Sequence, residues 1–115
     1  MENRPIRVEV YATETGSTPF KEWLHPLKDL KAQAVVFKRL RRLELRNLGD
    51  FKYFDHILEL RIDYGPSYRI YCGKKENTWI VLLVGGTKRT QSEDVRTAQE
   101  YWKDWQKRFF SQRSV

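Results

Sequence analysis

The stretch from Ile57 to Gln91 reads ILELRIDYGPSYRIYCGKKENTWIVLLVGGTKRTQ and decides the fold, because it contains three successive strand patterns. Apolar and polar residues alternate over residues 57–62, which predicts a strand with one buried face. Turn residues then lead into a second alternating run at residues 68–72, so the two runs predict a hairpin. Residues 79–84 are apolar throughout, as in a central strand covered on both sides.

The alternation also predicts a polar face on this hairpin. The side away from the core would carry four side chains and show them to solvent or to a ligand: Glu59, Arg61, Arg69 and Tyr71. If Arg61 lies opposite Arg69, their like charges repel unless an anion lies between them. A shift of two residues would instead pair Glu59 with Arg69. The sequence leaves both registers open.

One strand and two helices are predicted before this stretch. Residues 6–11 alternate as a strand does, and Pro19 fits the first position of a short helix that ends before His25. Residues 27–48 have the periodicity of a long amphipathic helix. Its apolar side is assigned to Leu30, Ala34, Phe37 and Leu40, with Val36 and Leu43 beside them.

The other side of this long helix is assigned to five cations: Lys38, Arg39, Arg41, Arg42 and Arg46. A run of charge on a helix predicts a surface that faces solvent or a partner. Residues 51–55, which follow it, fit either a short strand or an extended lead-in to the hairpin.

A last helix is predicted to begin near Gln91, because Thr90 and Glu93 have the spacing of a capping box. Its apolar stripe consists of Val95, Ala98, Trp102, Trp105 and Phe109. Residues 111–115 are expected to be a frayed tail. The whole chain, 1–115, is then a single α+β domain, with N-terminal helices and a C-terminal helix packed on one face of an antiparallel sheet.

Composition narrows the class of protein. Hydrophobic residues make up 40% of the chain, which argues against disorder, and the formal charge of +7 is typical either of a domain that binds a polyanion or acidic partner or of a merely soluble one. The single cysteine, Cys72, predicts a packed thiol in a reducing compartment. No apolar run is long enough to span a membrane and no signal-peptide segment is present, so we expect no membrane partner and a cytoplasmic location.

The candidate chemistry depends on cations. Lys88 and Arg89 follow the last strand and would join Arg61 and Arg69 near one surface, with Tyr53, Tyr64 and Tyr71 available to stack on bases. The alternative is a set of surface ion pairs. His25 and His56 are isolated from other metal-ligating residues, and no phosphate loop or nucleophile motif is present, so we expect no metal and no cofactor. Cations suffice to cleave RNA, where the 2′-hydroxyl of the substrate is the nucleophile.

Three segments together resemble the RelE/ParE toxin superfamily, and within it the HigB-like addiction-module killer proteins of phage origin. They are LELR at residues 58–61, GPSYRIY at residues 65–71 and LLVGGTKRTQ at residues 82–91. The resemblance implies a RelE/ParE-like fold and the toxin of a bacterial type II toxin–antitoxin system. Such a toxin is silenced by a cognate antitoxin, here of the helix-turn-helix type, and its RNA-cleaving branch cuts mRNA on the ribosome without a metal.

Carried over by residue, the resemblance implies that Arg69 binds the phosphate, that Arg61 is a second cation, and that Lys88 or Arg89 is the basic residue after the last strand. Two departures from the RelE pattern leave the general base open. Glu59 stands where that pattern has a lysine, and no tyrosine begins the last helix. Glu59 either accepts the proton itself or pairs with an arginine, and the pairing role is slightly preferred.

Two other functions compete with an endoribonuclease. One is a ParE-like toxin that inhibits DNA gyrase without being an enzyme. Members of that branch usually lack the full basic set, so Arg61, Arg69, Lys88 and Arg89 favour cleavage of mRNA. The other is an inactive phage-derived relative that is kept as a binding module.

Overall fold

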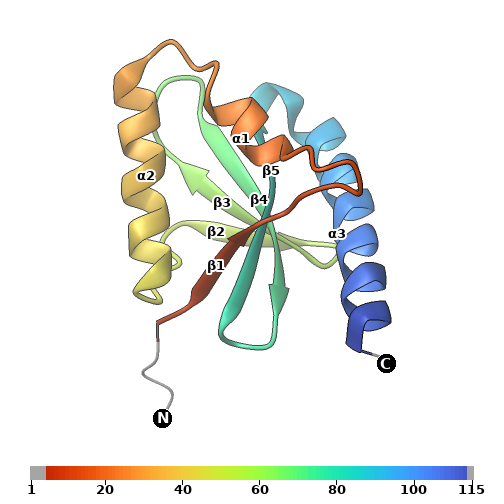
Figure 1. The fold of residues 1–115 in the computed structure, drawn as a ribbon. Coiled ribbons are helices and arrows are strands. Elements are labelled where there is room, and N and C mark those ends of the chain that lie inside the picture. The colour runs from red at the N-terminus through yellow and green to blue at the C-terminus, as the bar shows by residue number, and fades with distance from the viewer. Residues whose placement is uncertain (1–4, 114–115) are drawn as a thin grey trace.

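The alternating stretch forms the middle of a five-stranded sheet in the computed structural model, which describes residues 5–113 (Figure 1). Its elements in chain order are β1 (Arg7–Val10), α1 (Pro19–Leu24), α2 (Leu30–Glu44), β2 (Phe51–Phe54), β3 (Ile57–Ile62), β4 (Tyr68–Lys75), β5 (Trp79–Thr87), a short 3-10 helix (Lys88–Thr90) and α3 (Gln91–Arg113). The protein is therefore a mixed α+β fold with a C-terminal helix, and residues 51–54 are a strand.

The sheet has the order β1-β5-β4-β3-β2. Strands β2 to β5 are antiparallel to their neighbours, as predicted, but β1 runs parallel to β5. The prediction of an entirely antiparallel sheet was therefore wrong. The reason is the connection: two helices lie between β1 and β2, so no hairpin fixes the direction of β1.

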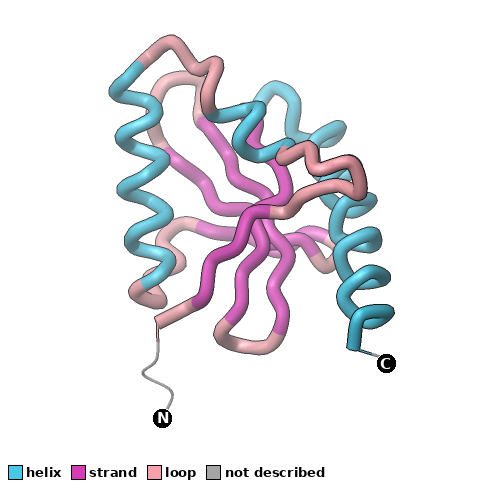
Figure 2. Tube along the Cα trace, in the orientation of Figure 1, coloured by secondary structure: helices cyan, strands magenta, loops and turns pink. Residues whose placement is uncertain are grey.

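Helices cover both faces of the sheet. Figures 1 and 2 show α1 and α2 on one side and α3 on the other, and each side has its own apolar core. Ile80 and Leu82 of β5 belong to the first core, whereas Val81 and Leu83 belong to the second. The prediction that all helices pack on one face was therefore wrong. The continuous apolar run of β5 reflects the burial of this strand on both sides.

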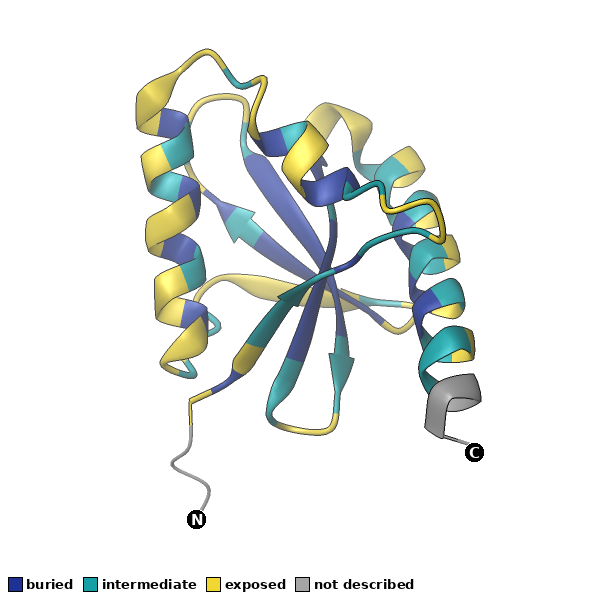
Figure 3. Cartoon of the chain, viewed as in Figure 1, coloured by how far each residue is buried: buried dark blue, intermediate teal, exposed yellow. Residues whose placement is uncertain are grey.

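Figure 3 shows that α2 has a buried side and an exposed side. The predicted apolar side was right for Val36, Leu40 and Leu43, which pack in the core with Ala32. It was wrong for Ala34, which is exposed, and for Leu30 and Phe37, which are 77% and 55% exposed. Both sides have helical spacing, so periodicity alone does not distinguish them.

Arg39, assigned to the solvent side of α2, is buried among the core residues. Its guanidinium donates hydrogen bonds to the backbone carbonyls of Arg61, Leu48 and Asp50. These bonds from Nε and Nη2 tie α2 to the segment that enters β2, whereas Nη1 of Arg39 is buried without a hydrogen-bond partner among the described residues.

Helix α3 begins at Gln91, as predicted, but the capping box in this region consists of Thr87 and Thr90 and caps the 3-10 helix that precedes α3. The helix continues to Arg113, so the prediction of a frayed tail from residue 111 was wrong for residues 111–113. Residues 114–115 lie outside the described range. Residues 1–4, at the N-terminus where no signal peptide was expected, also lie outside the described range. Within residues 5–113 no helix is both long and apolar enough to cross a membrane. Cys72 is buried, as expected of a packed thiol.

Candidate functional site

Two arginines on neighbouring strands form the centre of the candidate site. Arg61 of β3 lies directly opposite Arg69 of β4, which decides between the two registers left open by the sequence. The anion required between them is the carboxylate of Glu59: its Oε1 is 2.9 Å from Nε of Arg61, and its Oε2 is 3.8 Å from Nε of Arg69. Gln91, the first residue of α3, donates from Nε2 to Oε2 of Glu59 at 2.7 Å. One carboxylate thus faces two guanidinium groups.

Most of this polar face is buried, contrary to the prediction that it faces solvent. Glu59 and Tyr71 are fully buried and Arg69 is 8% exposed, because α3 covers this side of the sheet. The side chain of Arg61 retains 33% exposure. Both carboxylate oxygens of Glu59 are occupied inside the protein, which favours its pairing role over proton transfer with a substrate.

Arg69 has hydrogen-bonding capacity that the protein does not use. Its Nε and Nη1 atoms are buried and have no hydrogen-bond partner among the described residues. The 3.8 Å separation from Glu59 gives charge attraction but is too long for a hydrogen bond. A buried donor without a partner is costly, and such groups concentrate at functional sites. Arg69 therefore has unused donors close to Arg61, and both donor atoms are buried in this conformation.

The first turn of α3 contributes a second carboxylate, Asp94. Gly86 of β5 lies opposite Arg69, and a Cβ atom added to it would meet Oδ2 of Asp94 at 1.9 Å. The absence of a side chain at Gly86 thus lets α3 approach the sheet beside Arg69. Burial raises the pKa of Asp94, and this effect exceeds that of the hydrogen bond from Thr90, which lowers it. Asp94 is a candidate proton acceptor.

Sequence reasoning missed both Gln91 and Asp94. The pattern places them on the last helix but does not show which face of the sheet that helix covers. The glycine pair before the helix was the available signal, because glycines in a strand mark a close approach of another segment.

Tyr71 is held neutral in the same buried region. Burial raises the pKa of its hydroxyl well above the ordinary range, and the nearby Glu59 and Asp94 carboxylates raise it further. Its ring packs in the core beneath α3, so a base cannot stack on it in this conformation.

Of three other predicted residues, Lys88 and Arg89 lie near the start of the strand of Arg69, and Tyr64 lies on the other side of the sheet. Lys88 and Arg89 are exposed directly after β5, and the backbone N–H of Lys88 donates to the carbonyl of Ser67 just before β4. They therefore lie at the end of the sheet where the strand of Arg69 begins. Tyr64 belongs to the opposite side: it packs against the α1–α2 core and donates to Asp29 at 2.9 Å, the contact that raises its pKa.

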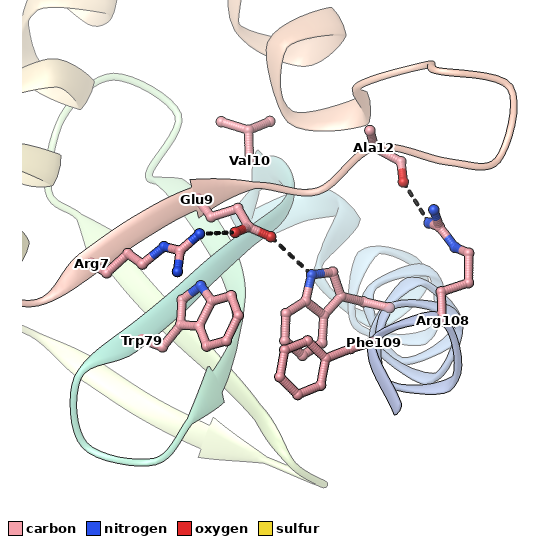
Figure 4. A pocket seen from close by; sticks show the side chains of 8 residues that line it. Arg7, Glu9, Val10, Ala12, Trp79, Arg108 and Phe109 are labelled. Atoms are coloured by element: carbon pink, nitrogen blue, oxygen red, sulfur yellow. Dashed lines mark hydrogen bonds and ion pairs between the residues drawn. The ribbon is translucent and has the colours of Figure 1, made fainter. Parts of the chain in front are cut away.

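Away from the arginine pair, a cavity of about 350 Å³ lies between β1 and the second half of α3 (Figure 4). Its charged groups are bonded within the protein. Glu9 accepts from Arg7 at 3.3 Å and from the indole of Trp105 at 3.0 Å, and Arg108 donates to the carbonyl of Ala12 at 2.5 Å. These contacts attach α3 to the first strand and the loop that follows it. In the part of the chain that the structure describes, no cluster of three or more His, Cys, Asp or Glu could hold a metal.

Comparison with known proteins finds a relative whose function is not described. No family model matches the chain, and no solved structure matches it. The chain is 43% identical over 81 residues to an uncharacterized protein of Haemophilus influenzae, an alignment that covers 70% of this chain and 82% of that protein. This chain therefore belongs to the same family as the uncharacterized Haemophilus influenzae protein.

Proposed function

We propose that this protein is a HigB-like toxin of the RelE/ParE superfamily that cleaves mRNA on the ribosome without a metal. The observation that carries the proposal is the pair Arg61 and Arg69, which shares one carboxylate, while two guanidinium nitrogens of Arg69 have no hydrogen-bond partner among the described residues. Preorganised cations beside open donors stabilise charge that develops on a phosphate. The RelE-like fold is part of the same proposal, and it is compatible with the mixed five-stranded sheet.

The reaction follows from the substrate. The 2′-oxygen of one nucleotide attacks the adjacent phosphorus, and the bond from phosphorus to the 5′-oxygen of the next nucleotide breaks. The products are a 2′,3′-cyclic phosphate and a free 5′-hydroxyl, so the proton lost from the 2′-hydroxyl is balanced by one gained at the leaving oxygen. Arg69 and Arg61 would stabilise the extra negative charge of the phosphorane. Lys88 and Arg89 would bind the flanking phosphates.

Asp94 is the proposed general base. Glu59 has both oxygens occupied within the protein, whereas Asp94 lies against Gly86, the strand partner of Arg69, and is only partly buried. A pKa raised by burial makes a carboxylate a stronger base. Glu59 would then act by holding the two arginines in position.

A cognate antitoxin is the proposed partner, and the exposed side of α2 is its proposed docking surface. Leu30 and Phe37 are exposed there at helical spacing, and Lys31, Lys38 and Arg42 border them. An acidic amphipathic segment would cover the apolar residues and neutralise the cations. Pairing of this surface with a second copy of itself would bring like charges together, which favours a different protein. Action on ribosomes implies a cytoplasmic location.

The proposal is tested with purified ribosomes that carry labelled mRNA, with supercoiling by purified DNA gyrase measured in parallel. Cleaved mRNA with unaffected supercoiling is the expected result. Intact mRNA with blocked supercoiling would overturn the enzymatic function and favour a gyrase inhibitor instead.

A further inference from the structure

A groove lies at the end of the sheet where β2 turns into β3, away from the loop of Lys88. Two adjoining cavities of about 520 and 590 Å³ share His56, Trp102 and Gln106. The first cavity lies between the β2–β3 turn and the middle of α3. The second lies between the same turn and the end of β4. Each volume suffices for a group the size of a nucleotide.

The turn that borders this groove has an unusual backbone for its residues. Phe54 pairs with Ile57, so Asp55 and His56 form a two-residue hairpin turn, and their φ angles are 41° and 74°. A positive φ at both positions is typical of the type I′ turn, which favours glycine at the second position because other residues are strained there. His56 is exposed, and no hydrogen bond or ion pair to the rest of residues 5–113 uses its imidazole. The fold thus bears a strained histidine that does not stabilise it, which points to a ligand.

We propose that the groove binds a segment of single-stranded nucleic acid. Lysines that can contact phosphates line both cavities, Lys103 in the first and Lys74 in the second. Tyr53 is 49% exposed at the rim, which gives one ring besides His56 on which a base can stack. The amide of Gln106 and the side-chain oxygen of Gln99, whose Nε2 donates to the carbonyl of Asp55 at 3.5 Å, can hydrogen-bond to base edges. An acidic peptide would use the lysines but not the rings, so this combination favours a nucleic acid.

The groove and the arginine pair lie along the same helix. Gln91 bonds Glu59 at the start of α3, whereas Gln99 and Lys103 line the groove, about 12 to 18 Å further along the helix axis. A strand held at Arg69 could therefore continue into the groove within a few nucleotides. That the two sites hold the same RNA strand rests on the proposed function, but binding in the groove does not.

The experiment measures fluorescence anisotropy of a labelled single-stranded oligouridylate of about eight nucleotides, a length typical of such sites. His56→Gly removes the ring and leaves a residue that the turn prefers, so its thermal midpoint should equal or exceed that of the parent. Its affinity should fall about tenfold, the loss of roughly one stacked base. His25→Gly, at an exposed histidine outside the residues that line the groove, is the control and should bind like the parent.

A second pair of variants tests the phosphate contact. Lys103→Gln should lower the salt dependence of log affinity by about 0.7, the value for one phosphate contact on a single strand, whereas Lys21→Gln on α1 should leave it unchanged. Undetectable binding by the parent, or parental affinity in His56→Gly, would overturn the proposal. Equal competition by polyglutamate and by a single-stranded DNA of the same charge would also overturn it, in favour of an acidic peptide. The assay needs neither ribosomes nor cleavage, so failure of the toxin function leaves its outcome readable.

Discussion

Arg61 lies directly opposite Arg69 in the antiparallel ladder of β3 and β4, and both guanidinium groups share the carboxylate of Glu59. Like charges in facing positions destabilise a sheet, so this arrangement requires the buried anion between them. Gln91 holds that anion from the start of α3. The site therefore forms only when β3, β4 and α3 have come together.

Replacement of Glu59 by Gln should destabilise the protein by about 2 to 4 kcal/mol, because it leaves two cations without their buried counter-ion. Asp50→Asn is the matched control. Its carboxylate lies 3.9 Å from Arg61 but is 69% exposed, so its loss should cost less than about 1 kcal/mol. Urea unfolding measures both. Equal midpoints for the two variants would mean that Glu59 does not compensate the arginines.

The rate of mRNA cleavage should depend on the ionisation of Asp94. Because burial raises its pKa, the carboxylate loses its proton at a higher pH than the ordinary value of about 3.9, and the rate should rise as pH increases through that raised value. Asp94→Asn should lower the rate by about 10²- to 10⁴-fold and remove this acidic limb of the profile. Glu93→Gln, in the same turn, should retain the limb. An acidic limb that persists in Asp94→Asn would assign the base to another group.

Substitutions on the two sides of α2 should have opposite effects. Leu30→Ser with Phe37→Ser should change the stability by less than about 0.5 kcal/mol, because both side chains are mostly exposed, but should weaken binding of the antitoxin. Leu43→Ala, on the buried side, should cost about 2 to 5 kcal/mol. Thermal unfolding and titration with the antitoxin separate the two effects. Unchanged antitoxin affinity in the double variant would place the docking surface elsewhere.

Acid should weaken the attachment of α3 to the loop that follows β1. Asp104 accepts hydrogen bonds from Arg108 at 2.6 Å and from Tyr11 at 2.6 Å, and these contacts, Arg108 first, lower its pKa. A carboxyl group with a lowered pKa stabilises the fold above its unfolded value of about 4 and loses that contribution as pH falls through the folded value. Asp104→Asn should therefore cost about 1 kcal/mol at neutral pH, allowing for solvent screening, and nothing in acid. Urea unfolding of the parent and of Asp104→Asn across this pH range measures the difference. A difference in unfolding free energy that stays constant with pH would contradict the prediction.

Local patterns predicted the elements well. The strand at residues 57–62, the helix at Pro19–Leu24 and the start of α3 at Gln91 are found where alternation, proline and helix-start signals placed them. Decisions that depend on long-range packing were less successful. Helix α2 has apolar residues on two sides, and which side is buried depends on the sheet it meets, as Phe37 and Val36 illustrate.

The site was predicted in part for the same reason. Alternation placed Glu59, Arg61 and Arg69 together on one face, because side-chain direction within a hairpin is a local property. It could not place Asp94 against Gly86, the strand partner of Arg69, since that contact depends on the face that α3 covers and on the missing side chain of Gly86. Burial of Tyr71 has the same origin.

Single-turnover cleavage of labelled mRNA on purified ribosomes, with the end groups of the products identified, tests the central claim most directly. The parent protein should cut the mRNA and leave a 2′,3′-cyclic phosphate and a 5′-hydroxyl. Arg69→Gln, shown to be folded by circular dichroism, should cut about 10²- to 10³-fold more slowly, the effect of losing one preorganised donor to the developing charge. Products with a 5′-phosphate and a 3′-hydroxyl, or an Arg69→Gln protein that cuts as fast as the parent, would contradict a reaction driven by the arginine pair.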